Sequence, residues 1–477
     1  MHDVVIDPVS RIEGHAKITL RLNETGAVDD ARFHITEFRG FEEFCRGRPV
    51  WEMPSLTART CGICPVSHLL ASAKAADAIL SVTAPPAAVV QRRLANLGQI
   101  IQSHALSYFH LSAPDLLLGM DADPASRNVF AMMATQPDLV RRGIRLRQFG
   151  QEIVAAVSGE RIHGSWIVPG GVARPLLPSA RDAIRARIVE AKTAATDTLE
   201  EFVRLLDRFP REVEAFGHFD SLFLAHCGPD GCWAHDSGTL KVIAADGSVI
   251  AEGVDPADYR SWIGEWGEAD SYLKSPYWRP AVNGHDPSPG MYRVGPLARV
   301  NICTGFGVPL ADEALAAFRE RAGRIATSSF YYHHARLIEV LACVELIEQV
   351  LDDPHLINAH VRAEAGINAT HGVGASEAPR GTLFHDYTVD DEGLVTAVNM
   401  VIATGQNNLA MNRTVLQIAR AFVEGPDISE GVLNRIEAGI RAFDPCLSCS
   451  THALGQMPLL VRVVAADGGL LAEVRRD

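Results

Sequence analysis

The chain has 477 residues, of which 47% are hydrophobic and 21% charged, so it is long enough to fold into several lobes around an extensive core. Its formal net charge of −14 at pH 7 argues against binding to nucleic acid or anionic lipid, and no run of Lys and Arg offers a local exception. It begins without a signal-like segment, and no stretch approaches the roughly 20 apolar residues that span a bilayer. We therefore expect a cytoplasmic protein without a membrane span.

The N-terminal region, residues 1–55, is predicted to form a small antiparallel sheet. Apolar and polar residues alternate over residues 16–22 and again over residues 31–35, which is typical of strands with one buried face. The segment Asn23-Glu24-Thr25-Gly26 between them is typical of a turn. We expect the two strands to pair through this turn.

From Pro65 onward the apolar residues have helical spacing. Proline is favoured in the first turn of a helix, so we expect a helix to begin at Pro65. This spacing defines a first helical part, residues 56–215, and a second, residues 301–452. Between them, residues 216–300 are rich in Gly, Asp, Trp and Tyr and form a predicted irregular insert. The expected helices lie at about 65–80, 83–111, 136–158, 179–208, 310–323, 327–352, 409–423 and 429–443, and the expected strands of the insert at 239–244 and 248–251.

These elements predict an α+β fold that is mainly α: a long helical bundle with a small N-terminal antiparallel sheet and an irregular insert. No internal repeat and no Gly-, Ser- or Pro-rich linker divides residues 1–452, which we expect to form one domain. Residues 453–477 follow as a tail. Apolar runs at 459–464 and 470–474, around Asp467-Gly468-Gly469, predict a hairpin in that tail.

Nine cysteines, an odd count in a chain without a secretory signal, argue against a disulfide framework. Four of them form two Cys-x-x-Cys pairs near opposite ends of the chain, Cys61 with Cys64 and Cys446 with Cys449. The other five have no second ligand at metal-binding spacing, and we expect them to pack in the core as small apolar residues. These five are Cys45, Cys227, Cys232, Cys303 and Cys343.

Both cysteine pairs are placed where a metal could bind. The first lies just before the helix that Pro65 opens, and a helix N-terminus favours thiolate over thiol. Pro445 should end the preceding helix, which leaves the second pair on a tight turn. The residues by themselves leave four chemistries open: two redox disulfides, a structural zinc site, an iron–sulfur cluster, and a thiolate site for nickel and iron.

Five motifs, taken in order, resemble those of the large subunit of nickel–iron hydrogenases, and the resemblance runs nearly end to end. The motifs are Asp7-Pro8-Val9-Ser10-Arg11-Ile12-Glu13-Gly14-His15, Arg39-Gly40-Phe41-Glu42, Arg59-Thr60-Cys61-Gly62-Ile63-Cys64-Pro65-Val66-Ser67-His68, Glu377-Ala378-Pro379-Arg380-Gly381 and Asp444-Pro445-Cys446-Leu447-Ser448-Cys449-Ser450-Thr451-His452. Related quinone-reductase subunits lack the cysteine pairs, so the resemblance is to the metal-binding branch. It implies an enzyme that reversibly splits H2 into protons and electrons.

The resemblance also implies the cofactor. The four thiolates would bind nickel, and soft sulfur ligands suit both nickel and iron. Cys61 and Cys446 would be terminal nickel ligands. Cys64 and Cys449 would bridge to an iron that carries carbon monoxide and cyanide.

Further site residues follow from the same motifs. By resemblance, Glu13 would relay a proton away from a cysteine, and a buried carboxylic acid suits that task. Arg380, with Asp444 near it, would lie over the open position of the metals and polarise H2 or accept a proton. Pro379 and Thr404 would line the diatomic ligands of the iron.

A magnesium site and one departure from the family complete the resemblance. Glu42 and His452 would help to hold Mg²⁺, together with a backbone carbonyl near Met400. His68, one turn into the following helix, could hydrogen-bond a cysteine thiolate, and a plain packed histidine is the alternative. Ser103 stands where members of the family often carry an aspartate.

Partners are implied in the same way. No cysteine cluster remains to carry electrons away, so an iron–sulfur small subunit is required. Stretches such as residues 37–42 and 168–172 resemble the cytoplasmic, multimeric, bidirectional branch of the family. This chain has no Gly-x-Gly-x-x-Gly motif, so the resemblance implies that flavin and NAD bind to a separate diaphorase module. A heterodisulfide-reductase- or ferredoxin-coupled enzyme is one alternative, and a non-enzymatic four-cysteine zinc scaffold is another. A maturation endopeptidase would remove residues 453–477, leaving His452 as the last residue.

Overall fold

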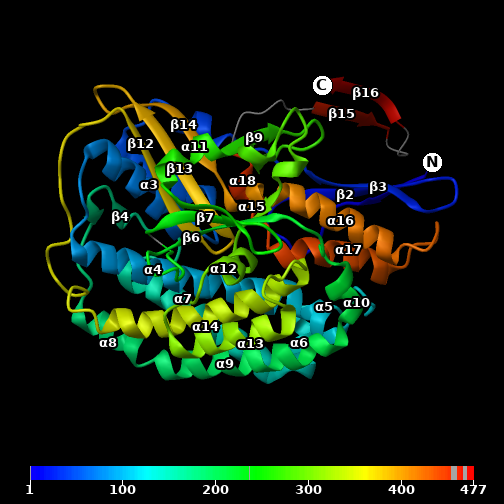
Figure 1. Cartoon of the computed structure of the whole chain (residues 1–477), viewed down its shortest axis with the longest axis horizontal. Helices are drawn as coiled ribbons and strands as arrows, with labels where there is room; N and C mark the ends of the chain where they lie inside the picture. The colour runs from blue at the N-terminus through cyan, green and yellow to red at the C-terminus, as the bar shows by residue number, and fades with distance from the viewer. Residues whose placement is uncertain (1, 236, 453–458, 466–469, 477) are drawn as a thin grey trace.

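The computed structural model describes residues 2–235, 237–452, 459–465 and 470–476. Long helices pack along one side of the molecule, and small sheets lie along the other (Figure 1). The N-terminal strands and the C-terminal hairpin lie toward the same end in this view. The α+β prediction, mainly α, is confirmed.

The two predicted N-terminal strands form and pair, and a third strand, which the sequence analysis did not predict, joins them. Its strands are β1 (His2–Ile6), β2 (Ala16–Leu22) and β3 (Val28–Ile35), paired antiparallel in that order. Side chains on one face, such as Ile18 and Leu20, are fully buried. This sheet packs against α16 (Asn408–Phe422), which seats the N-terminal region on the second helical part.

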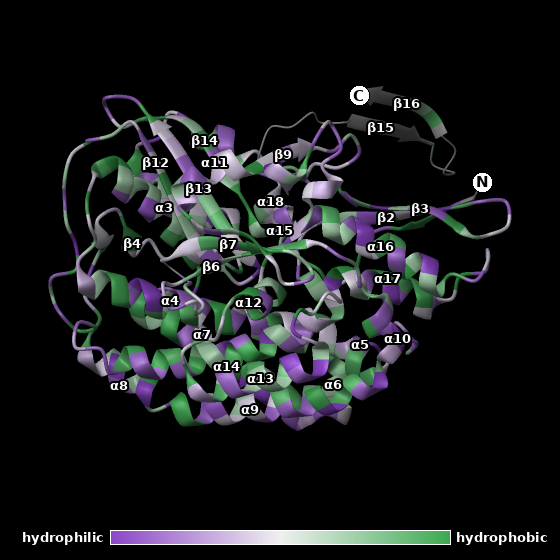
Figure 2. Cartoon of the chain, viewed as in Figure 1, coloured by the Kyte–Doolittle hydropathy of each residue, from purple (hydrophilic) through white to green (hydrophobic). Residues whose placement is uncertain are grey.

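The helical layer is built around closely packed long helices. α3 (Pro65–Leu80) has the predicted bounds, and α4 (Pro86–Ala105) crosses α7 (Pro137–Ser158) where Gly98 and Gly150 let the backbones approach. Outer helices such as α9 carry both polar and apolar residues along their length (Figure 2). No helix in the described ranges is both long and apolar enough to cross a membrane. The other long helices are α9 (Ile188–Leu205), α13 (Pro309–Ala322), α14 (Tyr332–Leu351) and α17 (Glu430–Phe443).

Two predicted helices are divided in the structure. The helix expected at 83–111 is α4 followed by a π-helical turn, Leu106–Ser112, and the helix expected at 179–208 is α8 followed by α9. The bend lets α8 pack on α7 while α9 packs mainly on α14. Short helices also occur that the sequence did not predict. The predicted helix at 179–208 begins as α8 (Pro178–Arg185). The unpredicted short helices are α1 (Phe41–Cys45), α2 (Met53–Thr57), α5 (Ala113–Leu118), α6 (Val129–Thr135), α10 (Pro210–Ala215), α11 (Tyr259–Trp262), α12 (Pro296–Ile302), α15 (Ala403–Gln406) and α18 (Leu447–Ser450).

The insert is more regular than expected. The predicted strands are present as β7 (Thr239–Ile243) and β8 (Val249–Val254). They belong to a four-stranded sheet of order β11-β6-β7-β8, whose other strands the sequence did not predict. The unpredicted strands of this region are β6 (Leu222–Cys227), β9 (Ile263–Gly267), β10 (Lys274–Trp278) and β11 (Tyr292–Arg293), and a two-stranded ribbon of β4 (Ile167–Val168) and β5 (Gly171–Val172) precedes it.

A three-stranded antiparallel sheet between the second-part helices was missed by the sequence analysis. It consists of β12 (His371–Ala378), β13 (Gly381–Val389) and β14 (Val395–Val401). Nearly every residue of β13 is buried, so the alternation that marks a half-exposed strand is absent. Gly372 and Gly374 let β12 lie directly on the backbone of α3. The turn between β12 and β13 carries Pro379 and Arg380.

The tail contains the predicted hairpin. β15 (Leu459–Val464) pairs antiparallel with β16 (Leu470–Arg476). The predicted turn within 466–469 and the connecting residues 453–458 lie outside the described residues.

Candidate metal centre

Four cysteine side chains from the two ends of the chain meet in the interior. Their sulfur atoms all lie within 4.8 Å of one another, with Sγ–Sγ distances of 2.7 Å between Cys61 and Cys64 and 2.6 Å between Cys446 and Cys449. Across the pairs, Cys61 lies 3.5 Å from Cys446 and Cys64 lies 3.6 Å from Cys449. None of the four is more than 5% exposed. Among the residues that the structure describes, no other group of three or more His, Cys, Asp or Glu side chains lies close enough together to hold a metal ion.

The first pair is held by the start of α3. The backbone N–H groups of Ile63 and Cys64 donate hydrogen bonds to the Cys61 sulfur at 3.2 and 2.9 Å. Cys64 is the N-cap residue, and Pro65 occupies the first helical turn. Because these N–H groups point at sulfur, they favour a thiolate at Cys61.

The second pair follows α17, with Cys446 at the N-cap of α18 and Cys449 within that short helix. Asp444 ends α17 in a left-handed conformation, with φ of 55°. The N–H of Cys446 then donates to Thr404 Oγ1 at 2.9 Å, and the backbone at Cys446 pairs in parallel with Glu13. The N-terminal motif and the residues after β14 thus hold the C-terminal cysteines in place.

The donor set fits soft metal ions. Burial raises the pKa of the Cys61 thiol, but the neighbouring cysteines and Arg380 outweigh burial and hold that pKa well below its ordinary value. Contacts among the sulfurs and burial together hold the pKa of Cys64 and Cys449 well above the ordinary value. Four buried thiolates would repel one another strongly without a cation, so their joint deprotonation requires bound metal. Nickel, iron and zinc all suit such ligands.

A small cavity opens beside Cys64, Cys446 and Cys449. Its volume is about 10 Å³, which is room for a molecule about the size of one water. The other residues around it are His68, Ala378, Pro379, Arg380, Leu383, Ile402, Ala403 and Thr404. Four residues singled out from the sequence, His68, Pro379, Arg380 and Thr404, therefore meet here.

Arg380 is the cationic group at this cavity. Its guanidinium pairs with the carboxylate of Asp444 at 2.9 Å and also donates to the Asp444 carbonyl. Nη1 donates to Ser103 Oγ at 3.3 Å, so Ser103 contacts Arg380 through a neutral hydroxyl. Burial disfavours the charged guanidinium, but Asp444 and the cysteine sulfurs hold the pKa of Arg380 well above its ordinary value. The side chain therefore stays charged beside the sulfurs.

Glu13 contacts the segment between the second pair of cysteines. Its carboxylate accepts hydrogen bonds from the Ser448 N–H, at 3.1 Å, and from the Ser448 hydroxyl. Burial, and after it the charge of Cys446, raises the pKa of Glu13 from 4.5 to about 8. A carboxyl group with this pKa holds a proton at neutral pH and can release it when its surroundings change.

Glu42 and His452 lie together next to Cys449. His452 Nε2 is 3.4 Å from Glu42 Oε1, and His452 Nδ1 is 2.9 Å from the Cys449 carbonyl oxygen. The Met400 N–H donates to Glu42 Oε1 at 2.8 Å. A carboxylate oxygen and a ring nitrogen therefore face one another, an arrangement that can hold a cation.

His68 lines the cavity but makes its hydrogen bond elsewhere. Its Nδ1 lies 3.0 Å from His385 Nε2, and His385 Nδ1 in turn lies 2.5 Å from the Tyr387 hydroxyl. Burial lowers the pKa of His68 to about 4. The sequence analysis missed His385 and Tyr387, because their alternate spacing is meaningful only once β13 is known to be a strand.

Four of the five remaining cysteines pack in the core as predicted. Cys45, Cys227, Cys303 and Cys343 are each at most 6% exposed. The prediction is wrong for Cys232, which is partly exposed because it lies in the loop that follows β6. All nine cysteines are free thiols in the structure.

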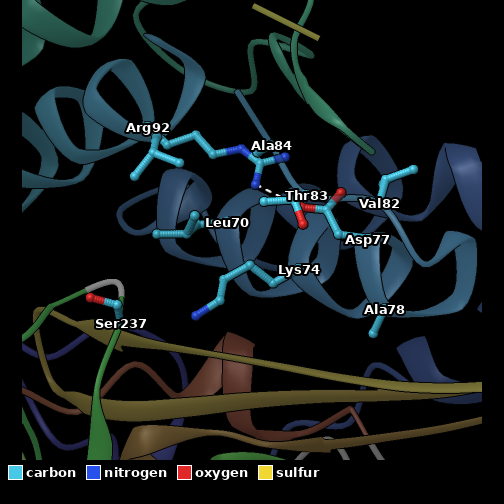
Figure 3. A pocket seen from close by; sticks show the side chains of 10 residues that line it. Leu70, Lys74, Asp77, Ala78, Val82, Thr83, Ala84, Arg92 and Ser237 are labelled. Carbon is cyan, nitrogen blue, oxygen red and sulfur yellow. Dashed lines mark hydrogen bonds and ion pairs between the residues drawn. The ribbon is translucent and has the colours of Figure 1, made fainter. Parts of the chain in front are cut away.

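A larger pocket lies beside α3 and the start of α4 (Figure 3). Asp77 and Arg92 point toward one another there and pair at 2.8 Å, and Lys74 extends from the same face of α3. This pocket contains none of the residues that the motifs single out. The smaller cavity beside the cysteines is therefore the candidate site.

Comparisons with known proteins bear on the whole chain. Residues 39–140 and 246–452 match the family described as nickel-dependent hydrogenase, and residues 3–38 match a family described as HoxL-like. The chain is 42% identical to the beta subunit of the NAD-reducing hydrogenase HoxS of Cupriavidus necator, over 99% of both chains. It is 40% identical to one subunit of the vhu F420-non-reducing hydrogenase of Methanococcus voltae, over 88% of this chain and 99% of the relative.

Solved structures share the fold. An NAD+-reducing NiFe hydrogenase in the H2-reduced state superposes with a TM-score of 0.91 at 45% identity, over 95% of this chain and 100% of that chain. The Ni-Fe-Se hydrogenase of D. vulgaris Hildenborough in the reduced state superposes with a TM-score of 0.75 at 25% identity, over 94% of this chain and 100% of that chain.

Proposed function

The chain belongs to the nickel-dependent hydrogenase family as a catalytic nickel–iron subunit, and from this premise we propose that its complex couples the reversible reaction of H2, giving two protons and two electrons, to NAD. The observation that carries the H2 reaction is the meeting of two distant cysteine pairs beside a cavity that admits only a very small molecule. Similarity to NAD-reducing hydrogenases supports the coupling to NAD. Because the chain belongs to this family, we no longer consider a non-enzymatic four-cysteine zinc scaffold.

The four thiolates are suited to hold a nickel–iron centre. When bound, this centre supplies the position at which the H–H bond is split and the electrons are taken up. By resemblance to the family, Cys61 and Cys446 would hold nickel alone, and Cys64 and Cys449 would hold nickel and iron together. The cavity wall formed by Pro379 and Thr404 would face carbon monoxide and cyanide on the iron.

The protein groups around the centre would manage protons and charge. Glu13 would take up a proton from a cysteine sulfur at a carboxylate oxygen and pass it outward, and its contact with Ser448 supports this role. Arg380, held by Asp444, would present a fixed positive charge at the cavity and polarise H2 there. His68 would line the cavity and orient the polar residues on β13.

We propose that Glu42 and His452 hold Mg²⁺. Their facing side-chain atoms support this assignment, and a carboxylate oxygen is a preferred magnesium ligand. His452 is 5% exposed and is followed directly by the tail.

The tail, residues 453–477, would be a propeptide that a maturation endopeptidase removes. The match to the nickel-dependent hydrogenase family ends at residue 452, which supports this boundary. Cleavage would leave His452 as the C-terminal residue and free the adjoining backbone to close over the centre.

The complex would contain several subunits. The NAD-reducing relative is itself named as one subunit of a larger enzyme, and this chain holds no second cysteine cluster in its described residues. We propose an iron–sulfur small subunit that receives the electrons and a flavin- and NAD-binding diaphorase module that delivers them. The alternative is a heterodisulfide-reductase- or ferredoxin-coupled enzyme, and it rests on the similarity to the F420-non-reducing hydrogenase. The cytoplasmic location stays a prediction.

Four measurements test this function. The purified complex should contain nickel and iron, show infrared bands of carbon monoxide and cyanide, and reduce an artificial dye with H2. Protein that holds stoichiometric zinc and neither nickel nor iron would refute the assignment. H2-dependent reduction of NAD by the complex, compared with reduction of ferredoxin, decides between the two couplings.

A further inference from the structure

Arg299 is a fully buried arginine whose donors are all used. It lies on α12 and is 0% exposed, and a guanidinium has five N–H donors. Nε and Nη2 grip both oxygens of Glu339, at 2.5 and 2.6 Å, and Nη1 donates to Glu377 at 2.6 Å. The remaining donors reach the carbonyl oxygens of Ala378, at 3.0 Å, and Pro379, at 3.1 Å. Arg299 therefore holds the two peptide groups that directly precede Arg380.

Glu339 connects Arg299 to the residues that contact the Arg380 guanidinium. Its carboxylate also binds His104 Nε2 at 2.8 Å, and both side chains are 0% exposed. His104 directly follows Ser103, whose hydroxyl accepts the hydrogen bond from Arg380 Nη1 at 3.3 Å. The Arg299–Glu339 pair thus contacts the backbone that carries Arg380 and, through His104, the helix position that receives its guanidinium.

The backbone of Arg380 is closely packed against Gly295. Gly295 lies against the Arg380 carbonyl oxygen, and a Cβ at this position would come within 2.5 Å of that oxygen. Gly295 also has a φ of 91°, which favours glycine. Because α12 follows Gly295 immediately, the backbone of Arg380 is enclosed between Gly295 and the donors of Arg299.

We propose that Arg299 and Glu339 are positioning residues that fix the Arg380 side chain over the cysteine site. The inference rests on the proposed role of Arg380. Neither residue lines the cavity, so each acts through the residues that it holds, which are Ala378, Pro379 and, after them, Arg380. Lysine cannot replace Arg299 because an ammonium group lacks the fork that grips Glu339 and the two carbonyls at once.

The test uses Arg299→Lys and Glu339→Gln in the purified complex. Both should keep wild-type nickel and iron content, while kcat for H2-dependent dye reduction falls about ten- to a hundredfold, since a small misplacement of a site group has an effect of that order. Backbone hydrogen–deuterium exchange in a peptide spanning residues 378–382 should also increase. This second readout does not depend on activity.

A matched control is available elsewhere in the helical layer. Arg92 is also buried, and it binds Asp77 at 2.8 Å (Figure 3). Its guanidinium also donates to the carbonyl oxygens of Gly171 and Val168, at 3.1 and 2.8 Å. Arg92→Lys disturbs a comparable network that does not contact the turn at residues 378–382. It should leave kcat and the exchange of that peptide unchanged.

The decisive comparison places Arg299→Lys in an Arg380→Lys background. There the added loss in kcat should be less than about twofold, because the residue that Arg299 positions is already altered. A full multiplicative loss, or unchanged exchange at residues 378–382, would overturn the proposal. The proposal would also be overturned if Arg299→Lys and Glu339→Gln both lost nickel and iron while Arg380→Lys kept them. That result would mean that Arg299 and Glu339 are needed only for folding. If Arg380→Lys itself kept wild-type kcat, the proposed role of Arg380 would fail, whereas the exchange result would still report the positioning.

Discussion

Replacing Glu13 by glutamine tests the proton path. The amide keeps the shape of the side chain and one oxygen to accept from the Ser448 N–H, and the backbone contact from the Leu447 N–H to the Glu13 carbonyl is untouched. Stability should therefore change by only about 1 kcal/mol, the usual net contribution of one hydrogen bond. The amide cannot take up and release a proton, however. Because a positioned acid or base contributes about 10² to 10⁴ in rate, turnover should fall by that factor, or about 3 to 5 kcal/mol in activation free energy.

The assay follows H2-dependent dye reduction together with hydrogen–deuterium exchange between gas and solvent. Glu37→Gln is the matched control, because Glu37 accepts from the His15 N–H at 3.1 Å in the same N-terminal region and does not contact the cysteines. The control should remain near the wild-type rate, and both variants should retain nickel and iron. Exchange at the wild-type rate in Glu13→Gln, with the metals present, would refute the role of this carboxylate.

Cys449→Ser should abolish H2 activation and lower the nickel and iron content, because a hydroxyl is too hard a ligand to replace a bridging thiolate, and near-normal dye reduction would contradict this. Intact-mass analysis of active enzyme should show a chain that ends at His452; active, nickel-loaded protein that keeps residues 453–477 would refute cleavage. Gly150→Ala should reduce the free energy of unfolding by about 1 to 3 kcal/mol, because the added methyl group overlaps the Gly98 carbonyl where α4 crosses α7, and an unchanged denaturation midpoint would argue against that close contact. Burial lowers the pKa of His226 from 6.5 to about 3, so between pH 6.5 and pH 3 the unfolded chain binds a proton that the folded chain does not, and the free energy of unfolding falls as pH falls. His226→Phe should reduce the slope of the free energy of unfolding against pH by up to about 1.4 kcal/mol per pH unit in this range. An unaltered slope would show that His226 does not contribute.

The sequence by itself determined features that depend on neighbours along the chain. α3 has the predicted bounds because Pro65 opens it and the apolar spacing continues to Leu80. The strands β2 and β3 followed from alternation on a half-exposed sheet. The spacing within each Cys-x-x-Cys pair predicted that its two sulfur atoms lie close together. The motifs and their order indicated the family, which the comparisons support.

Only the tertiary structure decided which distant residues meet. The strand β13 gave no signal because both of its faces are buried, and burial on both faces removes the alternation that marks a strand. The contacts of Arg299 with Glu339 and with the Pro379 carbonyl join three separate segments. No local pattern encodes such contacts, because they arise only when the packing of the whole core brings those segments within hydrogen-bonding distance and leaves their polar groups no water to bind.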